Sequence, residues 1–232
     1  MDRLLQLFRT DESYQKGVSK YGIMDGIIAI ALYIFLMIAY YLMGLYQANT
    51  NIYLGDPVSL LLIALCILAV VLRKDGIQSI GFQKKNAGKS IILGFVLGIF
   101  LVVGNIAVGL ENGKNFAPIQ TILLNVFYYL FIISLSEEMI FRGFIQSRIF
   151  GLVHNNLLTT ILVAIMFILS HIPYHMSAEK MTLLQFCQHN GTWFISLFVL
   201  HLFLTYLYRK YNSIFASTVF HALMDWSNGL FM

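Results

Sequence analysis

Long apolar segments separated by short polar connections run through the whole chain of 232 residues. A helix needs roughly 20 mostly apolar residues to cross the hydrocarbon core of a bilayer. Seven segments meet this length or come close to it: 21–46, 58–72, 90–110, 119–150, 157–172, 192–208 and 214–232. The second and fifth are short, and we expect them to extend into their flanks. The pattern predicts an all-α fold, a polytopic bundle of about seven transmembrane helices.

Composition supports the same class. Apolar residues make up 59% of the chain and charged residues only 11%, whereas a soluble domain carries about 25% charged residues. So little polar material cannot cover a soluble surface. We therefore expect an integral membrane protein whose partner is the lipid bilayer and which binds no nucleic acid.

Basic residues gather in every second connection. They precede the first segment and follow the second, the fourth and the sixth, at Arg3, Arg9, Lys16, Lys20, Arg73, Lys74, Lys84, Lys85, Lys89, Arg142, Arg148, Arg209 and Lys210. The alternate connections hold only Lys114 and Lys180. Because Lys and Arg are enriched in cytoplasmic loops, this asymmetry predicts seven spans with the N-terminus in the cytoplasm.

Charged residues lie inside the fourth apolar segment, where they are costly and are functional candidates by default. Glu138 and Arg142 are four residues apart, so they share a helix face and can pair. Glu137 is rotated from Glu138 by about 100°. One arginine cannot neutralise both carboxylates equally, so one of them is left for general acid–base chemistry.

Two later segments carry histidines. His171 lies on the fifth, and His221 and Asp225 lie four apart on the seventh, where Asp225 can accept the ring N–H of His221. These residues share a depth with the carboxylates only if the fourth helix continues to about Phe150. Gly151 is a suitable C-terminal stop, and with that boundary the heights agree within one or two helical turns.

Each of these residues also has a structural interpretation. A Glu–Arg pair can clamp two helices together, and a lone membrane histidine is more often a hydrogen-bonded packing residue than a catalyst. We assign His201 to this packing class and expect His154, His175 and His189, near connections, to be solvated. The catalytic interpretation is favoured by the set as a whole, which combines carboxylates, an arginine, two histidines and an aspartate on three apolar helices.

The order and spacing of these residues resemble a known family. The motifs are Glu137-Glu138-x-x-x-Arg142, Phe167-x-x-x-His171 and His221-x-x-x-Asp225. Together they resemble the CPBP family, also called the Abi family, which comprises type II CAAX prenyl proteases and bacteriocin-processing or immunity-type membrane proteins. The resemblance covers about residues 119–232 and implies an intramembrane endopeptidase.

The resemblance also implies roles. Glu137 would be the general base that activates a water molecule, assisted by His171. His221 and Asp225 would polarise the scissile carbonyl and stabilise the oxyanion. Many relatives carry Asn at the position of Asp225, and an ionised Asp cannot donate the hydrogen bond that an Asn can. Asp225 is therefore expected to orient His221, or else it must be protonated in order to donate. The supporting residues would be Glu138, Arg142 and Phe167.

Other mechanisms remain open. If zinc is bound, its ligands would be Glu137, His171 and His221, with an open fourth position. No HExxH pair is present, so we favour a glutamate mechanism that needs no cofactor. A serine mechanism is disfavoured because no serine has a recognisable nucleophile context, and we expect Ser170 to point to a different face from His171.

Two further functions compete with the peptidase. One is a non-catalytic membrane scaffold, such as a bacteriocin-immunity protein. The other is an ion-coupled transporter, which is disfavoured because the chain shows no internal repeat and has only three prolines. We expect one integrated membrane domain, with residues 1–116 free of motifs and residues 117–232 forming the catalytic core. The expected substrate is a membrane-associated peptide, and the expected location is a bacterial plasma membrane.

Overall fold

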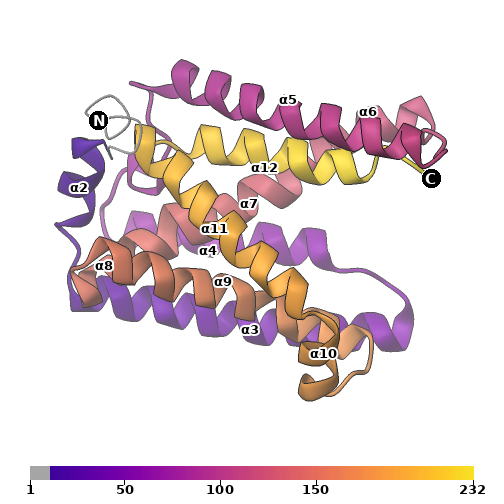
Figure 1. Cartoon of the computed structure of the whole chain (residues 1–232). Helices are drawn as coiled ribbons and strands as arrows, with labels where there is room; N and C mark the ends of the chain where they lie inside the picture. The colour runs from indigo at the N-terminus through magenta and orange to yellow at the C-terminus, as the bar shows by residue number, and fades with distance from the viewer. Residues whose placement is uncertain (1–10) are drawn as a thin grey trace.

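The computed structural model describes residues 11–232, and helices provide nearly all the regular structure of that part of the chain (Figure 1). The elements are α2 (Glu12–Val18), α3 (Ile23–Thr50), α4 (Gly55–Leu72), η1 (Ile77–Ile80), α5 (Ala87–Glu111), α6 (Ile119–Phe127), η2 (Tyr128–Ser134), α7 (Leu135–Glu138), η3 (Met139–Ile145), α8 (Gln146–Val153), α9 (Asn156–Ala178), α10 (Leu183–His189), α11 (Gly191–Tyr211) and α12 (Ile214–Asn228). The predicted all-α class is confirmed.

Six helical stretches within these residues are long and apolar enough to cross a membrane. They are α3, α4, α5, the continuous run Ile119–Val153, α9 and α11. The seventh predicted span is α12, which has 15 residues and lies alongside α5 (Figure 1). It is shorter than the roughly 20 residues of a full crossing. The structure thus agrees approximately with the predicted seven spans.

The fourth span is a single long helix with two changes of pitch. The segments from α6 to α8 follow one another without a break, and η2 and η3 are π-helical. Stretches of π-helix are rare and occur frequently at functional sites. Glu137 and Glu138 lie in α7, between the two π-helical stretches, so the helix continues well past them, as the shared-site prediction required.

The C-terminal boundary of this span differs from the expectation. The helix passes through Gly151 and ends at His154, which adopts the left-handed conformation (φ 53°). Gly151 instead allows the backbone at Gly22 to pack closely against α8, because a Cβ atom on residue 151 would lie 2.6 Å from the carbonyl oxygen of Gly22. A glycine near a helix end can serve either as a stop or as a packing contact, and only the neighbouring backbone decides which.

One end of the bundle collects the basic connections, and we call it the basic end: α2, residues 73–86, the end of α8 and residues 209–213. Arg148 is buried there and donates to Asp75 Oδ2 (3.2 Å). Lys20 Nζ also donates to Asp75 (2.7 Å), and Asp11 N donates to Arg209 O (3.1 Å). These connections therefore share one end, as the charge pattern predicted. Of the N-terminal basic residues, Arg3 and Arg9 lie outside the described residues. The cytoplasmic location of this end remains a prediction.

A small-residue contact brings α12 against α5. A Cβ atom on Gly94 would lie 2.4 Å from the carbonyl oxygen of Ala216, so only glycine allows this approach. Small residues at such contacts let membrane helices pack backbone to backbone. The contact fixes α12, which carries His221 and Asp225.

Candidate active site

A buried ion pair lies at the centre of the site. Arg142 Nη1 donates to Glu138 Oε1 over 2.9 Å, and both side chains are fully buried. The two residues are one turn apart on the same helix, as their spacing predicted. A charge held away from water needs such a partner, since removing one member of a buried pair strands the other. Glu138 is thus occupied by its partner.

His221 on α12 lies against the same carboxylate. Its Nδ1 is 3.1 Å from Glu138 Oε1, and its Nε2 is 3.3 Å from Asp225 Oδ2. Only the doubly protonated ring can donate to both carboxylates at once. The ring therefore lies between two acidic side chains, and Asp225 occupies the position from which it can orient His221.

His171 on α9 has one ring nitrogen engaged by its own helix. Nδ1 lies 2.7 Å from the carbonyl oxygen of Phe167. A carbonyl oxygen only accepts, so in the neutral ring Nδ1 carries the hydrogen and Nε2 keeps its lone pair. The sequence motif thus has a direct physical meaning, because a residue four positions earlier sets the tautomer. The arrangement leaves Nε2 able to accept a proton.

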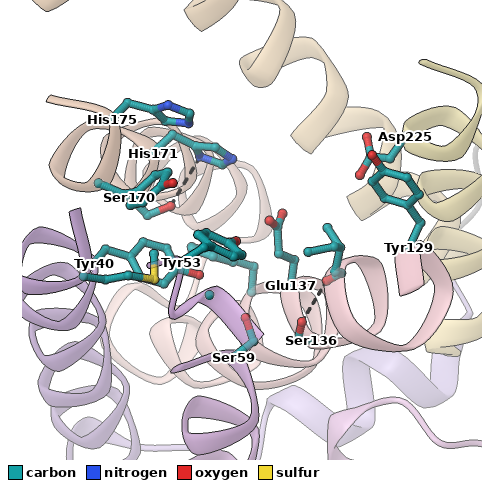
Figure 2. A pocket seen from close by; sticks show the side chains of 15 residues that line it. Tyr40, Tyr53, Ser59, Tyr129, Ser136, Glu137, Ser170, His171, His175 and Asp225 are labelled. Atoms are coloured by element: carbon teal, nitrogen blue, oxygen red, sulfur yellow. Dashed lines mark hydrogen bonds between the residues drawn. The ribbon is translucent and has the colours of Figure 1, made fainter. Parts of the chain in front are cut away.

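Two cavities meet at Glu137. The first has a volume of about 610 Å³ and the second about 370 Å³. Glu137, His171 and Asp225 line both, and His221 lines the second. Figure 2 shows the Glu137 side chain projecting into the space between His171 and Asp225. Glu137 has no hydrogen bond or ion pair with any residue of the described chain, in contrast to Glu138. Of the two neighbouring carboxylates, Glu137 is the one that faces open space.

The walls of the first cavity include residues that the sequence patterns did not single out. Tyrosines line it from three helical segments and from the connection between α3 and α4, at Tyr40, Tyr53, Tyr129 and Tyr174. His175 also lines it and lies 5.3 Å from Trp193, measured between ring centroids. Its side chain is 39% exposed, in agreement with the expectation that it is solvated, but its place at the cavity was not predicted. Its position four residues after His171 was the available signal, since that spacing repeats a helix face.

Ser170 departs from the expectation. It lines the first cavity beside His171, and its Oγ lies 3.5 Å from His171 Nδ1. The same hydroxyl donates to Phe167 O over 2.7 Å. Because Nδ1 faces that carbonyl as a donor, it cannot also deprotonate Ser170. The prediction that Ser170 faces away is wrong, but the reason to disfavour a serine nucleophile is stronger.

The zinc alternative can be tested against the donor atoms. Both ring nitrogens of His221 face carboxylates, so neither lone pair is directed at Glu137 or His171. Across residues 11–232 no group of three or more His, Cys, Asp and Glu side chains is arranged to hold a metal ion. The predicted ligands Glu137, His171 and His221 therefore do not fit zinc as they are placed.

The segment that carries the three motifs matches a known family. Residues 119–227 match the family model described as type II CAAX prenyl endopeptidase Rce1-like. The match agrees with the predicted resemblance. The matched segment includes all three motifs, from Glu137 to Asp225. A search of the curated proteins finds no match to the chain.

The Rce1-like match also separates two parts of the site. The carboxylates and histidines lie within the matched residues, whereas α3, α4 and α5 lie outside them. Yet Tyr40 from α3 and Ser59 from α4 line the first cavity. The candidate reacting groups thus lie in the matched segment, and part of the cavity wall comes from outside it.

Proposed function

We propose that the protein is an intramembrane endopeptidase that hydrolyses a peptide bond of a membrane-associated peptide with a water molecule activated by Glu137 and His171. The observation that carries the proposal is the unpaired carboxylate of Glu137, which lies with His171 where two cavities meet inside a helical bundle. The match to the Rce1-like family, a protease family, supports peptide-bond hydrolysis as the reaction.

The proposed reaction uses the two free acceptors of the site. Glu137 takes one proton from water as the water oxygen attacks the scissile carbonyl carbon, and His171 Nε2 accepts a hydrogen bond from the same water. When the C–N bond breaks, the proton on Glu137 passes to the leaving amine. Water thus supplies a hydroxyl to one product and a proton to the other, and Glu137 returns to its starting state.

The oxyanion is stabilised by His221. Glu138 holds Nδ1 of this ring at 3.1 Å, and the longer contact of 3.3 Å joins Nε2 to Asp225. In this assignment Nε2–H of His221 donates to the carbonyl oxygen of the substrate. That hydrogen bond replaces the contact between Nε2 and Asp225. A charged donor placed where negative charge develops strengthens most in the transition state. Asp225 then orients the ring in the resting enzyme and donates nothing itself.

The two cavities define how a substrate lies. A chain whose scissile bond lies at Glu137 extends into both cavities, with one side of the bond among the tyrosines and the other near Trp193, Leu197 and Leu200. Trp193, Leu197 and Leu200 give the second cavity an apolar side, and an extended peptide with a hydrophobic residue there fits it. We place the protein in a bacterial plasma membrane, where a leader or other membrane-bound peptide is the substrate class.

The test is cleavage of a peptide library by protein reconstituted into vesicles. Glu137→Gln and His171→Ala are compared with wild type. Glu111→Gln, an exposed carboxylate at the end of α5, is the matched control. We expect cleavage to be lost in the two site variants, with normal expression and folding, and to be unchanged in the control. Cleavage that persists in Glu137→Gln contradicts the proposal. Protection against a bacteriocin that persists in both site variants would favour the scaffold function.

A further inference from the structure

Two rows of polar residues, all buried except the half-buried Arg209, face each other behind the candidate site. One row lies on the fourth span at Glu138, Arg142 and Gln146, and the other lies on α11 at His201, Thr205 and Arg209. Each row repeats every four residues, so its members share one helix face. The rows meet where Thr205 Oγ1 donates to Gln146 Oε1 over 3.0 Å. We call these six residues the polar file.

The lower part of the polar file is joined to the basic end by direct contacts. Gln146 Nε2 donates to Thr160 Oγ1 (3.4 Å), and Thr160 Oγ1 donates to Asn156 O (2.7 Å). Arg209 reaches the same carbonyl oxygen with both terminal nitrogens at 3.5 Å. Hydrogen bonds thus lead from the half-buried Arg209 and Asn156 into the core as far as Gln146 and Thr205.

The upper part of the polar file is equally continuous. Arg142 donates to Glu138, Glu138 contacts His221, and His221 contacts Asp225. The two parts are one helical turn apart, about 5.4 Å along each helix axis. On the upper side of this gap lie Arg142 on one row and His201 on the other, and we call this level the layer.

Five unsatisfied polar atoms lie together in that one layer, while the others of the described chain lie singly on different residues. Arg142 Nε and Nη2, both ring nitrogens of His201, and Glu138 Oε2 are buried and have no hydrogen-bond partner among residues 11–232. All three side chains have 0% exposure. The Phe167 ring locates the layer, since it lies 4.5 Å from the Arg142 guanidinium and 5.3 Å from the His201 ring. His201 is as buried as a packing residue should be, but it lacks the hydrogen bond expected of one.

We propose that this layer binds water and that the bound water completes a hydrogen-bonded path from the basic end to Glu138 and His221. Water fits because it both donates and accepts. It can accept from the guanidinium N–H groups, donate to the imidazole lone pair or to Glu138 Oε2, and so satisfy several buried groups together, as internal waters generally do. A dry layer would leave five polar atoms with the full cost of desolvation.

This water site is separate from the two cavities. Arg142, Gln146, His201 and Thr205 line neither of them. A bound peptide that fills the cavities would therefore leave the polar file in contact with the basic end. The path then exchanges protons and water with Glu138 and His221 while substrate occupies the site. This kinetic role rests on the proposed peptidase function, whereas the water site itself does not.

The water site is tested directly by hydroxyl-radical footprinting of the full-length protein in lipid nanodiscs, because radicals generated from bound water oxidise adjacent side chains. Labelling of each residue is normalised to that of the denatured protein. We expect strong labelling of His201 despite its 0% exposure, and little labelling of Phe186, which is 1% exposed in an aromatic cluster away from the file. Thr205→Val should lower the labelling of His201 several-fold. Equal protection of His201 and Phe186 in wild type would overturn the proposal.

The kinetic role is tested by the rate of peptide cleavage in light and heavy water. Thr205→Val removes the hydroxyl that contacts Gln146, and His201→Phe removes both ring nitrogens. Thr218→Val is the matched control, since Thr218 is also buried without a partner in the described chain but lies on α12, outside the polar file. We expect kcat to fall about fivefold in Thr205→Val, as for the loss of one hydrogen bond, with a larger solvent isotope effect and an unchanged KM.

The outcomes separate this proposal from the proposed function. Wild-type kcat and isotope effect in both Thr205→Val and His201→Phe would refute the kinetic role while leaving the peptidase intact. A protein that labels His201 strongly but cleaves no peptide would retain the water site and lose the peptidase. An equal loss of kcat in Thr218→Val would show that removal of any buried hydroxyl is enough, and would count against the path.

Discussion

Two sides of one helix contrast sharply at Glu137 and Glu138. Glu137 faces two cavities and has no partner in the described chain, whereas Glu138 is fully buried and contacts both Arg142 and His221. The residues differ by one step, a rotation of about 100°. The two side chains are chemically identical, so the difference comes from their surroundings. Those surroundings leave Glu137 free to react and give Glu138 a structural role.

The largest expected effects come from exchanging these two carboxylates for amides. Glu137→Gln should lower the cleavage rate by roughly a hundredfold to ten-thousandfold, the range of a general base, with little change in stability. Glu138→Gln should instead destabilise the protein by about 3–5 kcal/mol, because Arg142 loses its buried partner. Cleavage assays in vesicles check the expected loss of activity in Glu137→Gln. Thermal unfolding in detergent checks the expected loss of stability in Glu138→Gln. Equal stability of the two variants would show that Glu138 does not stabilise the fold.

The next effect concerns the helix contact that places His221. Gly94→Val would put side-chain atoms against the Ala216 backbone, where even a Cβ atom would lie 2.4 Å from the carbonyl oxygen. We expect a loss of about 1–3 kcal/mol in stability, as for overpacking, together with reduced cleavage because α12 moves. Gly104→Val on the same helix is the control, since no heavy atom lies within 4 Å of a Cβ there. The prediction fails if both variants unfold at the same temperature.

A smaller effect should distinguish the two cavities. Ser59→Phe narrows the first cavity, and Ser196→Phe narrows the second. Ser59→Phe should raise KM for peptides that are bulky on one side of the scissile bond. Ser196→Phe should raise KM for peptides that are bulky on the opposite side. A pocket contact of this kind changes discrimination by about 10- to 200-fold. Peptide libraries varied on each side of the cleavage site provide the measurement, and identical preferences in the two variants would contradict the substrate path.

The smallest effect is expected for a carboxylate at the basic end. Asp11 caps α2 by accepting from Ser13 N (2.7 Å). Partial burial raises the pKa of Asp11, but hydrogen bonds from Ser13 and the charge of Lys85 outweigh it, so the net pKa is lowered. Asp11→Ala should cost about 1 kcal/mol, as for other N-caps.

The pH dependence of that cost follows from the direction of the shift. A lowered pKa in the folded state means that the ionised cap stabilises the protein at neutral pH and that this contribution is lost as the pH falls through the folded pKa. The stability difference between Asp11→Ala and wild type should therefore shrink in acid. Unfolding curves at neutral and acidic pH check this, and a difference that grows in acid would contradict it.

Much of the fold followed from local rules. Apolar length predicted the spans, because a bilayer imposes a minimum length on any crossing helix. The four-residue spacings predicted the Glu138–Arg142 pair and the placing of Asp225 beside His221, because a helix face repeats at that interval. The same rule applied to His171 would have placed His175 at the cavity, which is compatible with its predicted contact with solvent.

Other features had no local signal. Nothing in the pattern around Tyr40, Tyr53 or Ser59 marked them as cavity walls, because they come from α3, α4 and their connection, which carry no motif. Gly151 was interpreted as a stop, since the sequence does not show that the backbone at Gly22 lies against it. His201 was assigned to packing, since a single buried histidine gives no information on its partners.

The sequence by itself determined that the chain is a bundle of membrane helices and which polar residues share a helix face, because both depend on the short-range periodicity of one helix. Only the tertiary structure decided which of the two adjacent carboxylates is left without a partner, that two cavities meet beside it, and that buried polar atoms line up behind it. Those features depend on contacts between helices far apart in the chain, and the side chains that fill or leave space there are set by packing rather than by spacing.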